Sequence, residues 1–425
     1  MRNPRPGSLR SPETRLNWVD AAWALLLLVT SPHWAAAAER KDLALLGAKV
    51  YSSPQATAIE DAVVVLHDGK IAAVGKRGQI KVPGSAQIID CRGKVITAGF
   101  WNSHVHFTEA VWNDAAKAAA TKLEEHMQTM LTSWGFTTVF DIASFLSRTN
   151  ALRARVESGE VPGPRIYTTG EPLYPRNGTP SYVGKEWDIP QASGPEEANA
   201  LAWQRLAAGA DGIKVFAGAI TKAGVIPMDP TIIRSAVEVA HEAGKPVFAH
   251  PSNRVGLDDA IEGGVDVLAH TAPMAKQYTA EELARMKKQH MALIPTLELF
   301  PYEEKKFGGT HEDEEAVLKT AIDELKSYFA AGGTILFGTD VGYMEIYDTS
   351  GELESMSRSG MTWRDILASL TTTPSTFFKA TQKGRVEKGM TADLVVLDAD
   401  PANDVRNLAK VAYTIRAGQV IYRKP

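Results

Sequence analysis

The chain has 425 residues, of which 44% are hydrophobic and 23% are charged, and its formal net charge is −4. That length allows a large core, with room for one barrel-sized domain and a smaller one, and the composition is that of a globular protein. The small negative charge gives no reason to expect nucleic acid as a partner. Cys91 is the only cysteine, so an intramolecular disulfide and a thiolate zinc site are both excluded. Any metal must be held by His, Asp, Glu or a lysine-derived group.

The N-terminus, residues 1–38, has the three regions of a secretory signal peptide. Four arginines precede an apolar run at residues 21–30, and Ala36 and Ala38 then form a small-residue cleavage site. The apolar run is about half as long as a membrane span requires, so we expect no stable span, and an uncleaved anchor is the alternative. The sequence therefore predicts an exported protein, periplasmic or secreted after cleavage near Ala38.

Both ends of the remaining chain have the pattern of β-structure. Residues 42–95 contain short β-branched runs, with Asp68-Gly69 as a tight hairpin turn, and further strand-like runs follow residue 390. We expect one small β-sandwich built from residues 39–95 and 384–425, with a second domain at residues 96–383 between these two segments.

Between these ends, strand-like runs alternate with helical ones. The predicted strands are residues 95–100, 137–142, 165–170, 212–218, 245–250, 265–270, 292–297 and 334–340. The predicted helices are residues 114–134, 151–158, 196–208, 230–243, 257–262, 280–289, 314–331 and 362–372. Eight such units over about 280 residues predict an α/β fold of the (β/α)8 TIM barrel type. The alternative, an open doubly wound sheet, would have a Gly-rich phosphate turn after its first strand, and this sequence has none there.

Polar residues fall where the strands of such a barrel end, and barrel enzymes place their active sites at these ends. His104 and His106 point to the same side of an extended strand, in the geometry of a metal-chelating pair. Three other strands end in metal-competent side chains: His250, His270 and Asp340. Each residue alone has a structural explanation, such as a hydrogen-bonded core histidine or a helix cap, but their joint occurrence favours a metal site.

Lys214 lies between Ile213 and Val215 in the fourth strand, where burial would desolvate its ammonium group and lower its pKa. A neutral amine there can react with carbon dioxide to give a carbamate, which is a carboxylate-like bridge between two metals. Four imidazoles, one carboxylate and one carbamate suit two divalent metal ions of intermediate hardness. Zinc is the expected metal, and iron, manganese and cobalt are alternatives.

Residues suited to bind a substrate lie in or near the loops at the same ends of the strands. Residues 170–193 form a long loop rich in Pro and Gly, and a loop of this length usually covers or lines a site. Four candidates could meet a substrate carboxylate: Tyr174, Arg176, Arg254 and Tyr343. The other barrel histidines are expected at the surface or in packing positions: His126, His241, His290 and His311.

The chain contains five motifs in order: VITAGFWNSHVHF, GADGIKVFAG, PVFAHPSN, GGVDVLAHTAP and ILFGTDVG. A closing run that ends in TADLVVLDADP follows them. On these motifs the chain resembles the amidohydrolase superfamily, and within it the imidazolonepropionase- and prolidase-like branch. The resemblance implies two metal positions bridged by a carboxylated Lys214. His104, His106 and Asp340 would hold one metal, and His250 and His270 the other. It also implies that Asp340 takes the proton of a metal-activated hydroxide as this attacks a carbonyl.

The chain departs from the family pattern at two places. Asn102 stands where the family usually has Asp, and a neutral group there would do less to raise imidazole basicity. The loop after the third strand, GEPLYPRNGTP, lacks a histidine that many relatives carry.

We therefore expect an exported, binuclear metal-dependent hydrolase that cleaves the C–N bond of a small amide. The expected substrates are a dipeptide, an N-acyl amino acid or a cyclic amide. Two alternatives stay open: a mononuclear deaminase of the same superfamily, which Lys214 argues against, and a non-catalytic barrel that binds a ligand. The sequence gives no prediction of oligomeric state.

Overall fold

The computed structural model describes residues 42–184 and 189–425. The predicted signal peptide, residues 1–38, and its cleavage site lie outside the described residues. Residues from Lys41 to Pro425 form one compact unit. Within the described part of the chain, no helix has the length and apolar character needed to cross a membrane.

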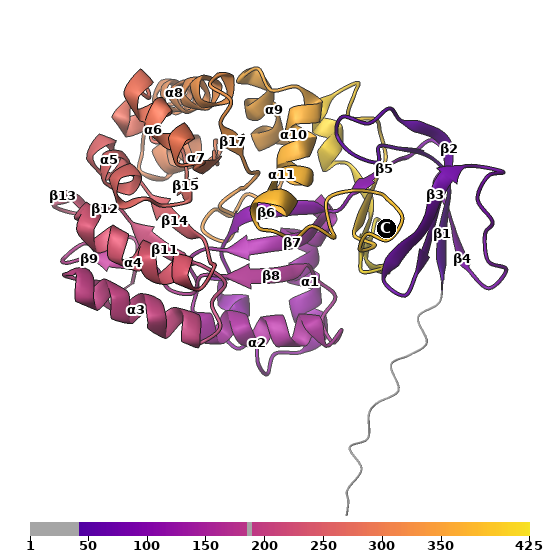
Figure 1. Ribbon diagram of the computed structural model, residues 1–425, viewed down its shortest axis with the longest axis horizontal. Coiled ribbons are helices and arrows are strands. Elements are labelled where there is room, and N and C mark those ends of the chain that lie inside the picture. Colours follow the sequence, from indigo (N-terminus) through magenta and orange to yellow (C-terminus); the bar gives the residue numbers. More distant parts are fainter. Residues whose placement is uncertain (1–41, 185–188) are drawn as a thin grey trace, which may run out of the picture. The chain divides into compact units, whose positions relative to one another are not determined.

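Both ends of the described chain contribute strands to one eight-stranded sheet. The N-terminal segment supplies β1 (Leu43–Val50), β2 (Ile59–His67), β3 (Lys70–Lys76), β4 (Gln87–Asp90) and β5 (Val95–Ala98). The C-terminal segment supplies β18 (Leu394–Leu397), β19 (Val411–Arg416) and β20 (Gln419–Arg423). The strand order is β20-β19-β18-β5-β1-β2-β3, with β4 paired to β1. The two segments meet where β5 and β18 pair antiparallel, and Figure 1 shows these ends in indigo and yellow.

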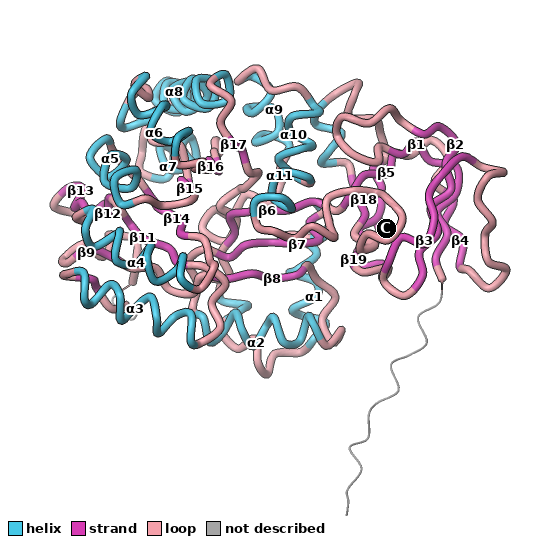
Figure 2. The backbone as a smooth tube through the Cα atoms, viewed as in Figure 1, coloured by secondary structure: helices cyan, strands magenta, loops and turns pink. Residues whose placement is uncertain are grey.

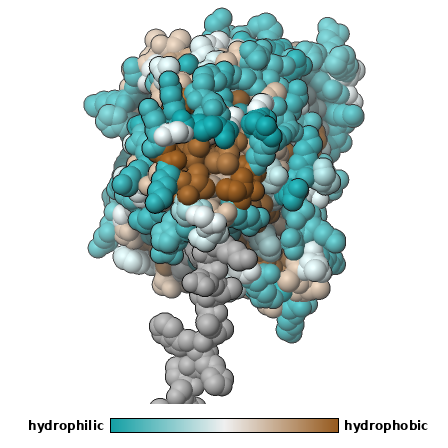
Figure 3. Space-filling model, turned by 90° about the vertical axis from the view of Figure 1, so that its right-hand side faces the viewer, coloured by the Kyte–Doolittle hydropathy of each residue, from teal (hydrophilic) through white to brown (hydrophobic). Residues whose placement is uncertain are grey.

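This sheet encloses an apolar core of its own, to which both segments contribute. Leu45, Ile96 and Ile415 are fully buried members of that core. A smaller apolar cluster lies around the buried side chains of Val63 and Val65 in β2. Figure 3, which views the molecule from the right-hand side of Figure 1, shows an apolar surface patch inside a hydrophilic surround. The predicted small β-sandwich from the two ends of the chain is confirmed.

Eight parallel strands form the barrel: β6 (Phe100–Val105), β7 (Phe136–Asp141), β8 (Arg165–Thr168), β11 (Ile213–Phe216), β14 (Val247–His250), β15 (Val267–Ala269), β16 (Ala292–Ile294) and β17 (Thr334–Ile335). They pair in two groups, β6-β7-β8 and β11-β14-β15-β16-β17. Single parallel bridges, Leu173 to Val215 and Val105 to Val341, join one group to the other on both sides. The strands therefore close into the predicted (β/α)8 barrel, and that prediction is confirmed.

Side chains alternate between the inside and the outside of this barrel. Phe248 and Ile294 belong to an inner apolar cluster, while their neighbours Ala249 and Leu293 belong to the cluster beneath the helices. Five aromatic rings pack together around the inner cluster: Trp101, Phe140, Tyr167, Phe248 and Phe378. Because a filled barrel has no pore, the polar side chains that point inward gather at the strand ends.

Helices flank the barrel strands, as Figure 2 shows: α1 (Ala120–Met130), α2 (Leu146–Glu157), α3 (Pro195–Ala207), α4 (Pro230–Glu242), α5 (Arg254–Gly263), α6 (Ala280–Lys288), α7 (Leu299–Lys306), α8 (His311–Ala330), α9 (Ser350–Arg358), α10 (Trp363–Leu370) and α11 (Thr372–Phe377). Short strands lie in the loops: β9 (Tyr174–Pro175), β10 (Gln191–Ala192), β12 (Gly218–Thr221) and β13 (Gly224–Pro227). The sequence pattern did not predict α7 or α9, which follow the seventh and eighth barrel strands.

The predicted first barrel strand, residues 95–100, is divided in the structure. Residues Val95–Ala98 belong to the β-sandwich as β5, and the barrel strand β6 begins at Phe100. Gly99 separates the two, and its N–H donates to the Asp393 carbonyl oxygen at 2.8 Å. A Cβ at Gly99 would lie 2.3 Å from Thr137 Oγ1, so the crossing from one sheet to the other requires glycine.

A buried ion pair generates a prediction about the sandwich. Lys383 and Asp393 pair with side chains that are 11% and 3% exposed, so Lys383→Met leaves a carboxylate buried without its cation. We expect a loss of about 3–5 kcal/mol of unfolding free energy, measured by chemical denaturation. Lys94→Met is the matched control, because its pair with Asp398 is 29% and 25% exposed and should cost at most about 1 kcal/mol. Equal losses in both variants would show that burial does not set the strength of these two ion pairs.

Candidate metal centre

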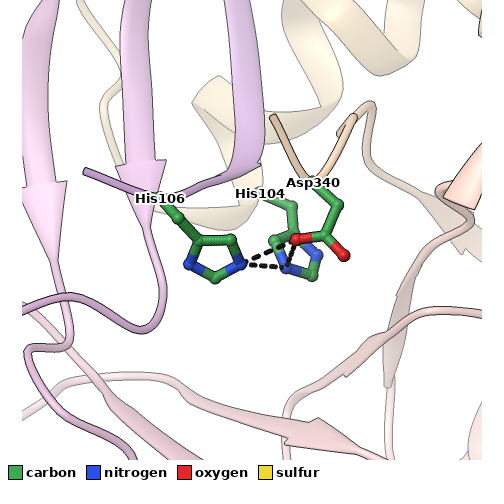
Figure 4. Close-up of side chains that lie close together, drawn as sticks. All are labelled: His104, His106 and Asp340. Atoms are coloured by element: carbon green, nitrogen blue, oxygen red, sulfur yellow. Dashed lines mark hydrogen bonds and ion pairs between the residues drawn. The ribbon is translucent and has the colours of Figure 1, made fainter. Parts of the chain in front are cut away.

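Two neighbouring barrel strands bring three ligand-type side chains together. His104 is in β6, His106 follows that strand, and Asp340 lies in the turn after β17. Asp340 Oδ1 lies 2.7 Å from His106 Nε2 and 3.2 Å from His104 Nε2, and the two Nε2 atoms are 3.1 Å apart. All three side chains are buried, and Figure 4 shows their polar atoms converging. The ligand atoms lie within 4.8 Å of one another, so a single cation can contact all three.

The donor set at this point fits a divalent cation. Burial lowers the pKa of His104 to about 4, so its imidazole is neutral and able to coordinate. Burial opposes ionisation of Asp340, but the imidazoles of His104 and His106 hold the pKa of its carboxyl well below the ordinary value. Asp340 Oδ1 faces the two Nε2 atoms at these short distances, but among the described residues it accepts no hydrogen bond of proper geometry. A cation bound by this oxygen and the two Nε2 atoms would satisfy that buried group.

The other three predicted ligands line the same cavity. Lys214 is in β11, His250 ends β14, and His270 follows β15. The ring centroid of His270 is 4.6 Å from that of His104 and 4.6 Å from that of His250. His270 Nδ1 lies 2.7 Å from Thr296 Oγ1, within hydrogen-bond distance, which leaves its Nε2 for a metal.

Burial also sets the protonation of these three groups. It lowers the pKa of Lys214 to about 7, and it lowers the pKa of His250 and of His270 well below the ordinary value. Both imidazoles are therefore neutral, and a substantial fraction of the Lys214 amine is neutral near pH 7. Neutral imidazole coordinates metals, and a neutral amine can react with carbon dioxide.

The backbone after β17 holds Asp340 beside the two histidines. Asp340 has a positive φ of 62°, which non-glycine residues rarely adopt. Its N–H donates to the His104 carbonyl oxygen at 2.9 Å, and the His106 N–H donates to the Val341 carbonyl oxygen at 2.8 Å. Gly342 continues the turn, and a Cβ there would lie 1.8 Å from the His106 carbonyl oxygen. Hydrogen bonds between two chain segments therefore place the ligands.

Asn102 joins the same two segments from the inside. Its side-chain Nδ2 donates to Thr339 Oγ1 at 2.8 Å, and its Oδ1 accepts from the N–H groups of His104 and Thr339, each at 3.2 Å. The residue is fully buried. Asn102 therefore positions the backbones that carry His104 and Asp340, whereas no hydrogen bond joins it to either imidazole in the described structure.

The cavity that holds these ligands has a volume of about 420 Å³. Of the four predicted substrate contacts, Tyr174 and Tyr343 line it, whereas Arg176 is exposed outside the lining. Arg254 also lies outside, because its guanidinium pairs with Glu282 and donates to two backbone carbonyl oxygens at 2.6 and 2.7 Å. The four other barrel histidines do not line the cavity: His126, His241, His290 and His311.

Tyr182, from the long loop that was expected to cover or line a site, also lines the cavity. Further lining residues that the sequence pattern did not single out are Thr108, Phe216, Glu303 and Lys306. Glu303 and Lys306 come from α7, which follows the seventh barrel strand. Their position after the end of a barrel strand could have identified them from the sequence, because the segments at this end of a barrel carry substrate contacts.

The contacts of Asn102 predict the outcome of its substitution. Asn102→Ala removes the acceptor of two buried N–H groups, so we expect a loss of about 1–3 kcal/mol of unfolding free energy and weaker zinc binding. Asn102→Asp is the matched control, because a carboxylate still accepts from both N–H groups and can accept from the Thr339 hydroxyl. Denaturation and zinc titration by a competing chelator would measure both effects. Wild-type stability in Asn102→Ala would show that these hydrogen bonds are unimportant.

The sequence profile of the Amidohydrolase family matches residues 95–421. A search of curated proteins gives no match. Among solved structures, a provisionally named prolidase from Bifidobacterium longum has 26% identity over 90% of this chain and 95% of that chain, with a TM-score of 0.76. A Xaa-Pro dipeptidase with bound methionine has 24% identity over 90% of this chain and 100% of that chain, with a TM-score of 0.77. Ochratoxinase from A. niger has 21% identity over 90% of this chain and 96% of that chain, with a TM-score of 0.73.

Because the family profile covers well over half of the sequence, and the barrel and its ligand cluster agree with it, the chain belongs to the amidohydrolase family.

Proposed function

We propose that this amidohydrolase binds two divalent metal ions and hydrolyses the carbon–nitrogen bond of a small amide. The candidate substrates are a dipeptide, an N-acyl amino acid or a cyclic amide. The observation that carries the proposal is the convergence of four imidazoles, one carboxylate and one lysine of lowered pKa on a single cavity. The similar structures named as a prolidase and a Xaa-Pro dipeptidase support a small peptide or amide as substrate.

The residues that would hold the metals divide into two sets, joined by Lys214. The first set is His104, His106 and Asp340, and the second is His250 and His270. Zinc is the proposed metal, with iron, manganese or cobalt as alternatives, because imidazole and carboxylate ligands suit all four. When bound, two such ions polarise the scissile carbonyl and acidify water.

Lys214 would join the two sets after carboxylation of its amine. The neutral Nζ attacks the carbon of carbon dioxide, a C–N bond forms, and one proton is released to solvent. The pKa of Lys214, lowered by burial to about 7, makes the neutral amine available for this reaction near neutral pH. The product is N6-carboxylysine, whose two oxygens replace one amine nitrogen as potential ligands.

Asp340 is the proposed proton carrier. Its carboxyl is ionised because its pKa lies well below the ordinary value, so it can accept a proton from the attacking water. It can then deliver that proton to the leaving nitrogen, which would otherwise depart as a poor leaving group. The buried position of Asp340, at 4% exposure, keeps bulk water from competing for the proton.

One observation favours a second candidate, a mononuclear deaminase-type site. Among the described residues, the group compact enough to hold a metal consists of His104, His106 and Asp340, and such a site needs only one further histidine. Lys214 would then have no part in metal binding. A metal content of one per chain, unaffected by replacement of Lys214, would identify this alternative.

Replacement of Lys214 tests the binuclear proposal. We expect two metal equivalents per chain in wild-type protein supplied with bicarbonate, and one or none in Lys214→Ala. Amide hydrolysis should fall by about a thousandfold or more, because the Lewis-acid contribution is worth several kcal/mol. Elemental analysis and a hydrolysis assay with dipeptides, N-acyl amino acids and cyclic amides would measure both quantities.

Lys222→Ala is the control for this experiment, because Lys222 is exposed in the turn between β12 and β13. It should keep wild-type metal content and activity. Full activity of Lys214→Ala would overturn the proposal, and a metal-loaded wild-type protein that is inert towards all three amide classes would favour a non-catalytic binding protein.

We also propose that the protein is exported. The arginine-rich start, the apolar run at residues 21–30 and the Ala36-x-Ala38 site support cleavage near Ala38. N-terminal sequencing of protein recovered from the periplasm or the medium should begin near Glu39. Recovered protein that starts at Met1 would contradict cleavage.

A further inference from the structure

One wall of the metal cavity is formed by a single face of α7. Leu299, Glu303 and Lys306 all line the cavity, and their spacing of four and then three residues places them on one side of a helix. Among the described lining residues, Glu303 and Lys306 are the charged ones that do not belong to the candidate ligand set. Away from the proposed metal ligands, a charged group of a substrate in this cavity would therefore meet these two side chains.

Glu303 presents a half-buried carboxylate to the cavity. Its Oε1 accepts a hydrogen bond from the Tyr343 hydroxyl at 2.9 Å, which fixes the side chain against the loop after β17. Burial raises the pKa of the Glu303 carboxyl, and the hydrogen bond from Tyr343 and the nearby Lys306 ammonium oppose that rise. In the described part of the chain no hydrogen bond reaches the second oxygen, Oε2, and a carboxylate in this position suits an ammonium group.

Lys306 presents an ammonium group to the mouth of the same cavity. Its Nζ lies 4.5 Å from the centroid of the Tyr343 ring and 5.4 Å from that of the Tyr302 ring, so two aromatic faces hold it in place. The rings leave donors of the ammonium group unused. A carboxylate of the substrate would meet them with a charge-assisted hydrogen bond.

We propose that Glu303 and Lys306 are specificity-determining residues that bind the free ammonium and the free carboxylate of a zwitterionic dipeptide. The proposal deepens the amide hydrolase function and rests on it for the position of the scissile bond. Side chains one helical turn apart are separated by about 5–6 Å at their Cβ atoms. A two-residue peptide spans about 7 Å, which is comparable with this spacing, so the two ends of one dipeptide can reach the two side chains of α7.

The aromatic surroundings of these charges suit the side chains of such a dipeptide. The ring centroids of Tyr182 and Tyr343 are 5.2 Å apart, and those of Tyr174 and Phe216 are 4.7 Å apart. All four rings line the cavity. Apolar residues in both positions of the dipeptide would bury surface against them, which contributes affinity without further charges.

The test compares substrates with blocked ends in full-length, metal-loaded enzyme. The probes are leucyl-phenylalanine, its N-acetyl form and its C-terminal amide. We expect wild-type kcat/KM to be at least about tenfold higher for the unblocked dipeptide than for either blocked form. Glu303→Gln should lower kcat/KM about tenfold for the probes with a free amine, and not for the N-acetyl form. Lys306→Met should do the same for the probes with a free carboxylate, and not for the amide.

Two neighbours on α7 supply matched controls. Glu304→Gln and Lys305→Met make the same changes of charge at positions outside the cavity lining, and they should leave all three values of kcat/KM unchanged. Equal losses for all three probes in Glu303→Gln and Lys306→Met would overturn the proposal. So would a wild-type enzyme that does not distinguish the blocked forms from the free dipeptide.

A binding measurement separates this proposal from the proposed function. The ketomethylene isostere of leucyl-phenylalanine keeps both charged ends and the carbonyl but has no C–N bond to cleave. Calorimetry should show weaker binding of its blocked forms, and the same dependence on Glu303 and Lys306. If no probe is hydrolysed but this dependence appears, the recognition of both ends stands, and the hydrolase function fails if N-acyl amino acids and cyclic amides are not hydrolysed either. If neither hydrolysis nor such binding is found, both are overturned.

Discussion

The closure of the barrel between β6 and the turn after β17 is the constraint on which the metal centre depends. The Asp340 N–H binds the His104 carbonyl oxygen, and the His106 N–H binds the Val341 carbonyl oxygen. These hydrogen bonds join the first barrel strand to the segment after the eighth. Three of the four residues that make them are proposed ligands of one metal, and the fourth, Val341, directly follows Asp340. The hydrogen bonds that close the barrel therefore also place these metal ligands. A barrel that opened at this seam would lose the site before it lost most of its core.

The site gathers titratable groups where burial opposes charge. The imidazoles of His104, His250 and His270 are neutral, and the amine of Lys214 is partly neutral, so these proposed ligands enter the barrel largely without a formal charge. Asp340 is the exception, and its negative charge is stabilised by the adjacent imidazoles. Bound cations would reverse this electrostatic situation, because they favour anionic ligands such as Asp340 and a lysine carbamate. Metal binding and the stability of the barrel should therefore be linked.

The proposed chemistry and the proposed specificity come from different parts of the fold. The proposed metal ligands lie in barrel strands or within a few residues of their ends, where hydrogen bonding between strands fixes the backbone. The opposite wall comes from α7 and from the loop that carries Tyr174 and Tyr182, which lie outside the barrel ladder. Such segments can change without disturbing the strands, which is how one barrel serves many substrates.

The sequence by itself determined the alternation of strands and helices, the β-segments at both ends and the positions of the six ligand-type residues in barrel strands or just after them. These features are local, because they follow from periodicity and from which residue follows an apolar run. The tertiary structure decided features that depend on partners distant in the chain. Gly99 divides one predicted strand because Thr137 packs against it, and Glu282 draws Arg254 away from the cavity. Lys306 lies at the cavity because α7 folds over it, and the apolar pattern of so short a helix does not specify what it covers.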